Sequence, residues 1–343
     1  MSKLLIITQR VNAEDQLLGF FLDWIREFSV HFEKVTILCL EKGKFNLPQN
    51  VEVRSLGKDE GHGKLRQLLN FYFLIFNLDK NYDAVFVHMN PIWVCLGSWF
   101  WHLKRKKVSV WYAHKSVTFK LKMAEKFADV IYASTPEGFR IHSNKLMITG
   151  QGINVDLFKP DSQFTTNSSQ LTILSVGRIA PIKNYESLIE AVKIMKDEGM
   201  NPTVSIIGEP GLKADFEYEK KLKNMVKNTG LETNITFLGK VHNQDLPAYY
   251  RKNKLYVNLS NTGSLDKTIL EAMASGCTVL SSNDSAKAFL PARLIIKETE
   301  SRMLAKQLKE ASGWDFGQEL RQYVVNNHSV SRLIKIISDS LKS

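Results

Sequence analysis

The sequence predicts an α/β protein made of two doubly wound domains, each a parallel sheet covered by helices. The chain has 343 residues, which is more than one hydrophobic core usually serves and therefore favours two domains. Short runs rich in valine and isoleucine alternate with amphipathic segments in both halves, as in parallel sheets that are buried on both faces. The polar stretch 161–170 separates the halves and reads as an interdomain linker.

In the first half, apolar runs of strand length alternate with segments whose apolar residues recur every three or four positions, the spacing of a helix. We expect strands at Leu4–Thr8, Val35–Leu40, Val51–Leu56, Ala84–His88, Val108–Ala113, Val130–Ser134 and Leu146–Thr149. We expect helices at Leu17–Phe32, Leu65–Leu78, Ile92–Lys104 and Phe119–Phe127.

The same alternation restarts after the linker. We expect strands at Thr172–Val176, Val204–Ile207, Ile235–Leu238, Leu255–Leu259 and Thr278–Ser281, and helices at Tyr185–Lys196, Phe216–Asn228, Leu246–Lys252 and Thr268–Ala274. The end of the chain, Leu320–Leu341, is amphipathic and is expected to be helical. The predicted organisation is domains at 1–160 and 171–318, the linker, and a helical tail at 319–343 that packs back on the first domain. Two such domains are expected to face each other across a central cleft, with ligands at the carboxyl ends of the strands.

The composition is that of an ordinary folded protein with a basic balance. Forty-six Lys and Arg against thirty-five Asp and Glu leave a net charge of +11, which favours an anionic partner such as nucleotide phosphates, nucleic acid or lipid headgroups. The three cysteines are scattered, which argues against a disulfide scaffold and a zinc site and indicates a reducing, cytoplasmic compartment.

Two segments raise the question of membrane insertion. The apolar run Leu4–Ile7 is too short for the core of a signal peptide. Residues 84–103 carry no charged side chain and are long enough to cross a bilayer, but Asn90-Pro91 divides them into a strand and a helix. We therefore expect no spanning helix.

Two stretches of the second half combine glycine with cations after a strand. In Gly177-Arg178-Ile179-Ala180-Pro181-Ile182-Lys183, two cations on one loop can converge on a phosphate group, although ordinary surface cations would have the same pattern.

In the stretch 262–276, a turn with Gly263 opens a helix whose free amides are a ready site for phosphate oxygens. Glu271 can accept ribose hydroxyls or form an ordinary helical pair with Lys267. An acid at the position of Asp266 is more often simply a residue that caps the helix.

Four motifs in this half are similar to the donor domain of family 4 GT-B glycosyltransferases, the retaining enzymes called glycosyl transferases group 1. They are Gly177-Arg178…Lys183, Ile207-Gly208-Glu209-Pro210-Gly211, Phe237-Leu238-Gly239-Lys240-Val241 and Leu270-Glu271-Ala272-Met273-Ala274-Ser275-Gly276, in the family's order. The resemblance covers most of 171–282, and Gly152-Ile153-Asn154-Val155-Asp156-Leu157-Phe158 resembles the family's link between domains.

The resemblance implies a role for each matching residue. Arg178 and Lys183 would bind the donor diphosphate, and Glu271 the ribose. Backbone groups near Gly208 and Val241 would surround the base, and the amides of Lys267 and Thr268 would face the diphosphate. A nucleotide sugar is then a substrate, and neither a cofactor nor a metal is implied, in agreement with the absence of any Asp-x-Asp from the sequence.

Two departures concern the sugar. The family commonly has a glutamate eight positions before Glu271, where this chain has Gly263, so that Asp266 or backbone groups would have to replace it. The family's N-terminal loop often carries paired glycines, whereas 9–16 contains none.

Three residues of the first half are candidates for the acceptor side. His114 follows a predicted strand and resembles the histidine that many relatives place beside the reacting sugar; a satisfied structural histidine is the other interpretation. His88, at another strand end, and Asn90 are weaker candidates.

A basic and aromatic segment lies between His88 and Lys145, with ten Lys and Arg against three Asp and Glu. It combines the run 104–107 and four further lysines with Trp99, Trp101, Trp111, Tyr112 and Phe119. Either it is a solvated rim or it contacts anionic lipid headgroups at the inner face of the plasma membrane. No nucleic-acid-binding motif is present.

The sequence thus favours a metal-independent glycosyltransferase that moves a sugar from a nucleotide sugar to a lipid-linked or saccharide acceptor in cell-envelope synthesis. A GT-B sugar-nucleotide epimerase and a non-catalytic nucleotide-sugar-binding protein are the alternatives. A dinucleotide dehydrogenase is disfavoured, because no Gly-x-Gly-x-x-Gly follows a strand.

Overall fold

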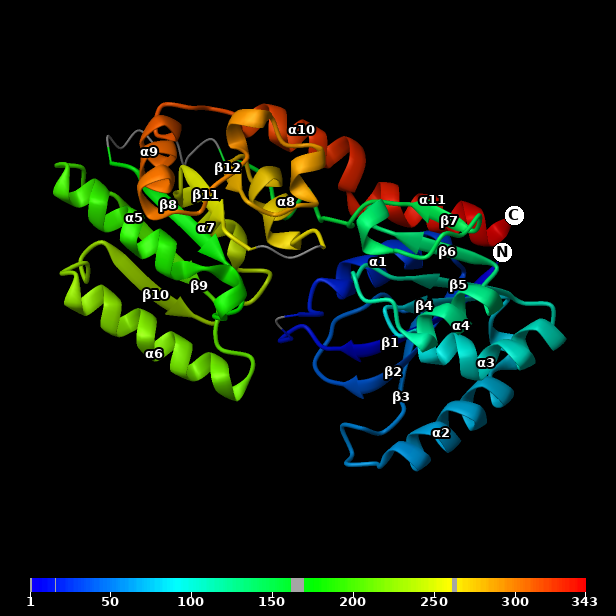
Figure 1. Cartoon of the computed structure of the whole chain (residues 1–343). Helices are drawn as coiled ribbons and strands as arrows, with labels where there is room; N and C mark the ends of the chain where they lie inside the picture. Colours follow the sequence, from blue (N-terminus) through cyan, green and yellow to red (C-terminus); the bar gives the residue numbers. More distant parts are fainter. Residues whose placement is uncertain (1, 16, 162–169, 261–263) are drawn as a thin grey trace. The chain divides into compact units, whose positions relative to one another are not determined.

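The computed structural model describes residues 2–15, 17–161, 170–260 and 264–343, and its chain divides into two compact units (Figure 1). Unit 1 comprises Met1–Asn154 and Asn327–Ser343, and unit 2 comprises Val155–Asn326. The first crossing between units therefore precedes the predicted linker, most of which lies outside the described residues.

Unit 1 is built on a seven-stranded parallel sheet. Its strands are β1 (Lys3–Val11), β2 (Lys34–Lys42), β3 (Val51–Ser55), β4 (Ala84–His88), β5 (Lys107–Trp111), β6 (Val130–Ala133) and β7 (Leu146–Ile148), in the order β3-β2-β1-β4-β5-β6-β7. Its helices are α1 (Phe21–His31), α2 (Lys64–Asn77), α3 (Pro91–Leu103), α4 (Phe119–Phe127) and α11 (Val330–Lys342), with short 3-10 turns at Asp79–Asn81 and Pro136–Gly138.

The buried strands have a core on each face because successive side chains of a strand point to opposite sides. Leu5 and Ile7 of β1 belong to the apolar cluster that receives side chains of α2, α3 and α4. Leu4 and Ile6 belong to the cluster on the other face, with side chains of α1 and α11. The sheet is therefore doubly wound, as predicted.

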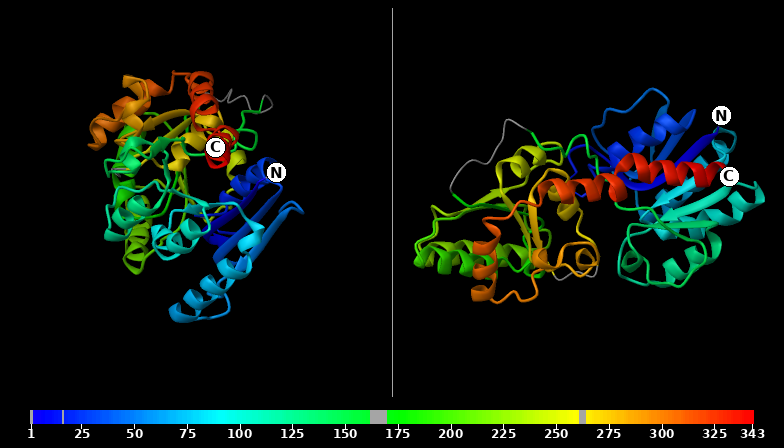
Figure 2. Two further views of the ribbon diagram at one scale, coloured as in Figure 1. Left: turned by 90° about the vertical axis from the view of Figure 1, so that its right-hand side faces the viewer. Right: turned by 90° about the horizontal axis from the view of Figure 1, so that it is seen from above.

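The last helix of the chain belongs to the first unit. α11 packs on α1, with Leu333, Ile334 and Ile337 fully buried, and both ends of the chain lie on the same side of unit 1 (Figure 2). The predicted single helix at Leu320–Leu341 is wrong in one respect. Ser329 has an extended backbone and pairs with Ile153, which separates α10 (Gly317–His328) from α11.

Unit 2 repeats the architecture on five parallel strands. They are β8 (Thr172–Val176), β9 (Thr203–Ile207), β10 (Ile235–Gly239), β11 (Leu255–Asn258) and β12 (Thr278–Ser281), in the order β10-β9-β8-β11-β12. Its helices are α5 (Tyr185–Asp197), α6 (Lys213–Asn228), α7 (Leu246–Lys252), α8 (Lys267–Ala274), α9 (Ser301–Ala311) and most of α10, with 3-10 turns at Pro181–Lys183, Ala286–Ala288 and Ala292–Leu294. The strand order reverses between β8 and β11, which is where doubly wound sheets bind ligands.

The uncharged stretch 84–103 divides as predicted. β4 ends at His88, Met89 has a left-handed backbone, and α3 begins with Pro91 at its first position. Among the described residues, no helix is both long and apolar enough to span a bilayer.

Candidate active site

The candidate site lies in unit 2 at the carboxyl ends of β8 and β11, beside the point where the strand order reverses. The loop after β8 supplies Gly177 and Arg178, and its 3-10 turn ends at Lys183. The segment after β11 leads to Asp266, which precedes α8. Strand order, rather than proximity in sequence, brings Lys183 and Asp266 together.

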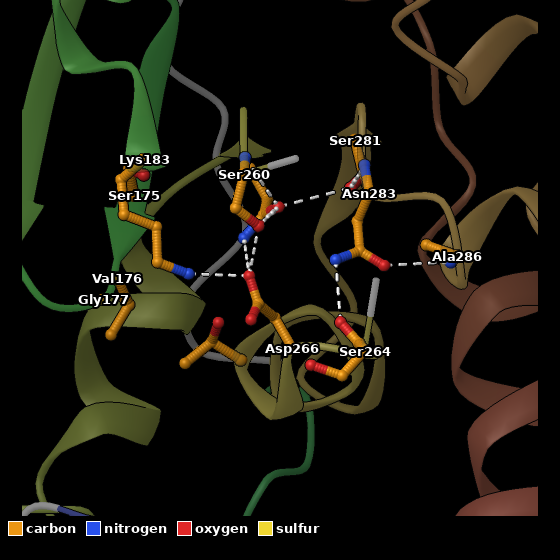
Figure 3. Close-up of polar contacts among 12 residues, drawn as sticks. Ser175, Val176, Gly177, Lys183, Ser260, Ser264, Asp266, Ser281, Asn283 and Ala286 are labelled. Atoms are coloured by element: carbon orange, nitrogen blue, oxygen red, sulfur yellow. Dashed lines mark hydrogen bonds and ion pairs between the residues drawn. The ribbon is translucent and has the colours of Figure 1, made fainter. Parts of the chain in front are cut away.

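Lys183 and Asp266 form the central contact of this site (Figure 3). The Lys183 Nζ atom lies 2.7 Å from Oδ2 of Asp266, and the two side chains are only 14% and 19% exposed. Asn258 donates to the same carboxylate oxygen at 2.9 Å, and the Ser260 hydroxyl also donates to it. Burial alone would raise the pKa of Asp266, but Lys183 and these hydrogen bonds outweigh it and lower that pKa.

Asp266 occupies the N-cap position of α8 but does not cap the helix with its side chain. In the described structure its side chain makes no capping hydrogen bond to α8, because its carboxylate faces Lys183. The interpretation of Asp266 as a side-chain cap is wrong.

Two glycines allow the strand ends to approach closely. A Cβ atom on Gly208 would lie 1.9 Å from the carbonyl oxygen of Gly177, and the φ of Gly208 is +141°. The Gly208 amide donates to the carbonyl of Gly239, and the Gly177 amide to that of Ile207, both at 2.9 Å. The motifs after β8, β9 and β10 thus meet at one edge of the sheet. Val241 follows on the same loop as Gly239 and is partly buried.

Arg178 has a different carboxylate partner from Lys183. Its side chain is 49% exposed, and its Nε atom lies 3.8 Å from Oδ2 of Asp215. Asp215 is buried and accepts hydrogen bonds from the Gly211 and Leu212 amides at 3.2 and 3.0 Å. A Cβ atom on Gly211 would lie 2.5 Å from Cδ of Arg178, so the glycine leaves room for this side chain.

Glu271 is buried one turn inside α8. Its carboxylate accepts hydrogen bonds from Asn243 Nδ2 and the Tyr250 hydroxyl, each at 3.2 Å. Burial raises the pKa of Glu271, although the charge of Lys267 and these hydrogen bonds act in the opposite direction. The Thr268 hydroxyl accepts a hydrogen bond from Tyr256 at 2.7 Å, which ties the first turn of α8 to β11.

Sequence reasoning did not identify the residues that hold this site in place. Asn258 and Ser260 orient Asp266, and buried Asn283 donates to the carbonyl oxygen of Ser264 at 3.0 Å (Figure 3). All three are polar residues at or just after the ends of β11 and β12, and that position was the available signal. Gly263, the predicted departure from the family pattern, lies outside the described residues.

The three acceptor-side candidates belong to unit 1. His88 is buried: its Nδ1 atom lies 3.2 Å from the Thr8 hydroxyl, and its ring stacks on Phe21 with centroids 4.1 Å apart. His114 is exposed, and its Nδ1 atom accepts a hydrogen bond from the Ser116 amide at 3.1 Å. Asn90 is partly buried and directly precedes α3. These contacts favour a structural role for His88 and leave His114 accessible to solvent.

No cluster of three or more histidine, cysteine or acidic side chains that could hold a metal ion occurs in the part of the chain that the structure describes. Unit 2 also contains a cavity of about 580 Å³ lined by Arg293, Lys306, Trp314 and neighbouring residues. None of the predicted site residues lines this cavity, so we assign the site to the strand ends instead.

A family model described as glycosyl transferases group 1 matches residues 159–326, nearly the whole of unit 2. The matched part of the chain, residues 159–326, belongs to the glycosyl transferases group 1 family.

The curated relatives that the chain matches are distant. Mannosylfructose-phosphate synthase of Agrobacterium fabrum is 26% identical over 53% of this chain and 45% of its own length. Alpha-monoglucosyldiacylglycerol synthase of Streptococcus pneumoniae is 21% identical over 48% of this chain and 41% of its own. The chain thus spans less than half the length of these two relatives.

Solved structures show that the fold of the chain is GT-B. The Anabaena protein HepE, solved in complex with UDP and glucose, superposes with a TM-score of 0.79 at 16% identity, covering all of both chains. TarM superposes with a TM-score of 0.76 at 11% identity, over 100% of this chain and 99% of that one. The predicted class, two Rossmann-like α/β domains of the GT-B type, is confirmed.

Proposed function

We propose that this protein is a glycosyltransferase that moves a sugar from a nucleotide-diphosphate sugar to an acceptor. One observation carries the proposal: the family match covers nearly the whole of unit 2. In this unit Arg178 and Lys183 follow the carboxyl end of β8, and the amino end of α8 follows that of β11. Such strand ends are where doubly wound sheets hold nucleotides.

The leaving diphosphate would be held by positive groups of unit 2. Lys183 has three N–H donors, of which Asp266 takes one, so the ammonium can bind a phosphate oxygen while it stays anchored. Arg178 is half exposed, and its planar guanidinium group can donate two hydrogen bonds to the phosphate group. The amides of Lys267 and Thr268 at the start of α8 add partial positive charge. Together they would stabilise the charge that develops on the leaving group, without a metal.

The nucleoside would be selected beside this diphosphate site. Glu271 lies one turn along α8 and could accept ribose hydroxyls, and backbone groups near Gly208 and Val241 would lie around the base. Since HepE was solved with UDP and glucose, UDP is the first nucleotide to test.

The acceptor is proposed to be lipid-linked or a saccharide, with retention of anomeric configuration, in cell-envelope glycan or glycolipid synthesis. The names of two relatives support such acceptors: one is a glucosyldiacylglycerol synthase, and another is the capsular polysaccharide biosynthesis glycosyltransferase CapH of Staphylococcus aureus. His114 is the unit 1 residue proposed to lie beside the reacting sugar, with Asn90 on the acceptor side. We place the protein in the cytoplasm, in peripheral contact with the membrane.

A panel of nucleotides and nucleotide sugars tests this proposal. UDP, GDP and ADP and their hexose derivatives should be compared for thermal protection and for slow release of nucleoside diphosphate. One base should raise the melting temperature, by several degrees at saturation, and its sugar should be hydrolysed slowly. Release of free sugar with inversion would contradict retention. Conversion to an epimer would favour the epimerase, and protection without turnover or product on any acceptor would favour a non-catalytic binding protein. No protection by any nucleotide would refute the donor site.

A further inference from the structure

Helix α2 in unit 1 is apolar on two opposite faces. Phe71 and Ile75 face the core and are fully buried. Leu65, Leu69 and Phe73, which recur every four residues, are 72%, 60% and 66% exposed. A surface helix usually places polar residues on its outer face, so this outer face lacks the partner that its composition requires.

The exposed stripe continues onto α3. Phe76 of α2 is also exposed, and its ring lies 6.0 Å from that of Trp99, with a T-shaped geometry. Trp99 and Leu103 follow each other by four residues on α3 and are 55% and 72% exposed. α2 lies at the edge of unit 1 (Figure 1). The contact between Phe76 and Trp99 joins the exposed apolar side chains of the two helices, and we call this surface the α2–α3 face. It comprises Leu65, Leu69, Phe73, Phe76, Trp99 and Leu103.

Exposed cations lie at the ends of the two helices that form this face. Residues 62–107 contain seven Lys and Arg against two Asp. Lys64, Arg66 and Arg105 are exposed at the ends of the two helices. One of the two acids, Asp79, is already neutralised by contacts with Lys104 and Lys106. The face therefore combines exposed apolar side chains with cations at the ends of its helices.

We propose that the α2–α3 face docks unit 1 on the surface of an anionic lipid bilayer without crossing it. Leucine and aromatic side chains would enter the boundary between headgroups and acyl chains, and the cations would meet the lipid phosphates. A second copy of the chain fits less well, because an isologous contact would bring the same cations against one another. Docking rests on the peripheral membrane contact of the proposed function and names the surface that makes it, but it does not depend on the transferase activity.

The structure changes which residues can carry this contact. In the predicted basic and aromatic segment, Trp101, Trp111, Tyr112 and Lys106 are buried, because they pack in the core of unit 1. Lys106 donates to the carbonyl of Tyr82 at 2.6 Å, and Lys107 to that of Ser340 at 2.6 Å. Removing the whole run 104–107 would therefore damage the fold. Trp99, Phe119 and the four further lysines of that segment are exposed, so part of the predicted contact is available. We assign the main contact to the α2–α3 face, to which Trp99 belongs.

Vesicle co-sedimentation of the full chain tests the proposal, with phosphatidylcholine vesicles compared with vesicles that contain phosphatidylglycerol. The wild type should bind the anionic vesicles, and binding should fall roughly tenfold when the salt concentration rises from about 50 to 300 mM. The variant Leu65→Ser/Leu69→Ser/Phe73→Ser should lose roughly tenfold or more of this binding. So should Lys64→Gln/Arg66→Gln/Arg105→Asn, in which Asn suits the left-handed backbone of Arg105.

The matched control is Leu212→Ser/Phe216→Ser in unit 2, whose side chains are 61% and 58% exposed. It should bind vesicles as the wild type does. Melting curves check that every variant is folded, and nucleotide protection, measured separately, reports on the donor site. Equal recovery of the wild type on neutral and anionic vesicles, recovery on neither, or equal binding by the α2–α3 and control variants would overturn the proposal. So would a concentration-dependent dimer that the same α2 substitutions abolish.

Discussion

Lys183 is held by a carboxylate that is itself held by Asn258 and Ser260. An ammonium on a flexible stem loses side-chain entropy when it binds a ligand, and an anchored one has already lost much of it. Because the side chains of Lys183 and Asp266 are mostly buried, removing Lys183 should also affect the stability of the fold.

Lys183→Ala should both weaken donor binding and destabilise the fold. Removing one partner of a buried ion pair leaves an unpaired charge, which costs roughly 3 kcal/mol. Denaturant unfolding should show this loss, and Lys183→Ala/Asp266→Ala should recover part of it. Unchanged unfolding of the single variant would mean that the pair does not form in solution.

Glu271 is expected to contribute to donor binding while it lowers the stability of the fold at neutral pH. Its pKa is raised by burial, so the folded state favours the protonated form, and the stability contributed by this group falls as the pH rises above the ordinary value of 4.5. Glu271→Gln should therefore raise the melting temperature at about pH 8 and change it little near pH 4.5, while donor affinity falls several-fold. An equal change at both pH values would show that ionisation of Glu271 is not the cause.

The positions of Lys183, Arg178 and Glu271 near the strand ends of unit 2 were predictable from the sequence, whereas their roles stay predictions. Their partners were not predictable, because pairing depends on strand order. Asp215 lies thirty-seven residues after Arg178 and Asp266 eighty-three after Lys183. His88, the weaker histidine candidate, is buried and stacks on Phe21, which favours a structural role but does not test a functional one.

At the scale of elements, the close approach of β8 and β9 depends on Gly208. Gly208→Ala would place a Cβ atom 1.9 Å from the carbonyl oxygen of Gly177, which is backbone and cannot move aside. We expect a loss of about 2–3 kcal/mol of stability and weaker donor binding, measured by unfolding and nucleotide titration.

Gly230→Ala is the matched control. Gly230 also has a positive φ, +67°, but no atom lies within 4 Å of the added Cβ. It should cost only about 1 kcal/mol, from backbone strain alone, and leave binding unchanged. If the two variants lose the same stability, close packing at Gly208 is not important.

Most helices and strands were predictable, because in a doubly wound fold the buried strands are continuous apolar runs, whereas the helices repeat apolar residues every three or four positions. The exceptions depend on contacts that periodicity does not encode. α1 begins at Phe21 rather than Leu17, and the break at Ser329 divides an amphipathic pattern because the backbone there pairs with Ile153. The outer face of α2 is as apolar in sequence as a buried face, so the sequence did not show that this face is exposed.

At the scale of the whole molecule, two Rossmann-like units were predictable from the repeated alternation. The crossing points were not: the chain leaves unit 1 after Asn154 and returns to it after Asn326, within α10. A linker read from polar composition does not show where packing contacts change from one unit to the other.

Activity should persist in excess chelator, because cations and amides of unit 2 would neutralise the leaving diphosphate. The measurement is nucleoside diphosphate release with and without EDTA, followed by addition of Mg²⁺. Turnover should stay within about twofold of the untreated enzyme. A complete loss that Mg²⁺ reverses would reveal a metal site.

The central claim, that unit 2 binds a nucleoside diphosphate at the ends of β8 and β11, is tested most directly by calorimetric titration of the nucleotide that the panel identifies. Arg178→Ala is the best variant, because its half-exposed side chain can be removed at little cost in stability. Lys220→Ala, exposed on α6, is the control. Loss of a charge-assisted contact worth about 1.5–3 kcal/mol should weaken binding by roughly ten- to a hundredfold in Arg178→Ala and leave Lys220→Ala unchanged. Equal affinity in all three proteins would contradict the assignment.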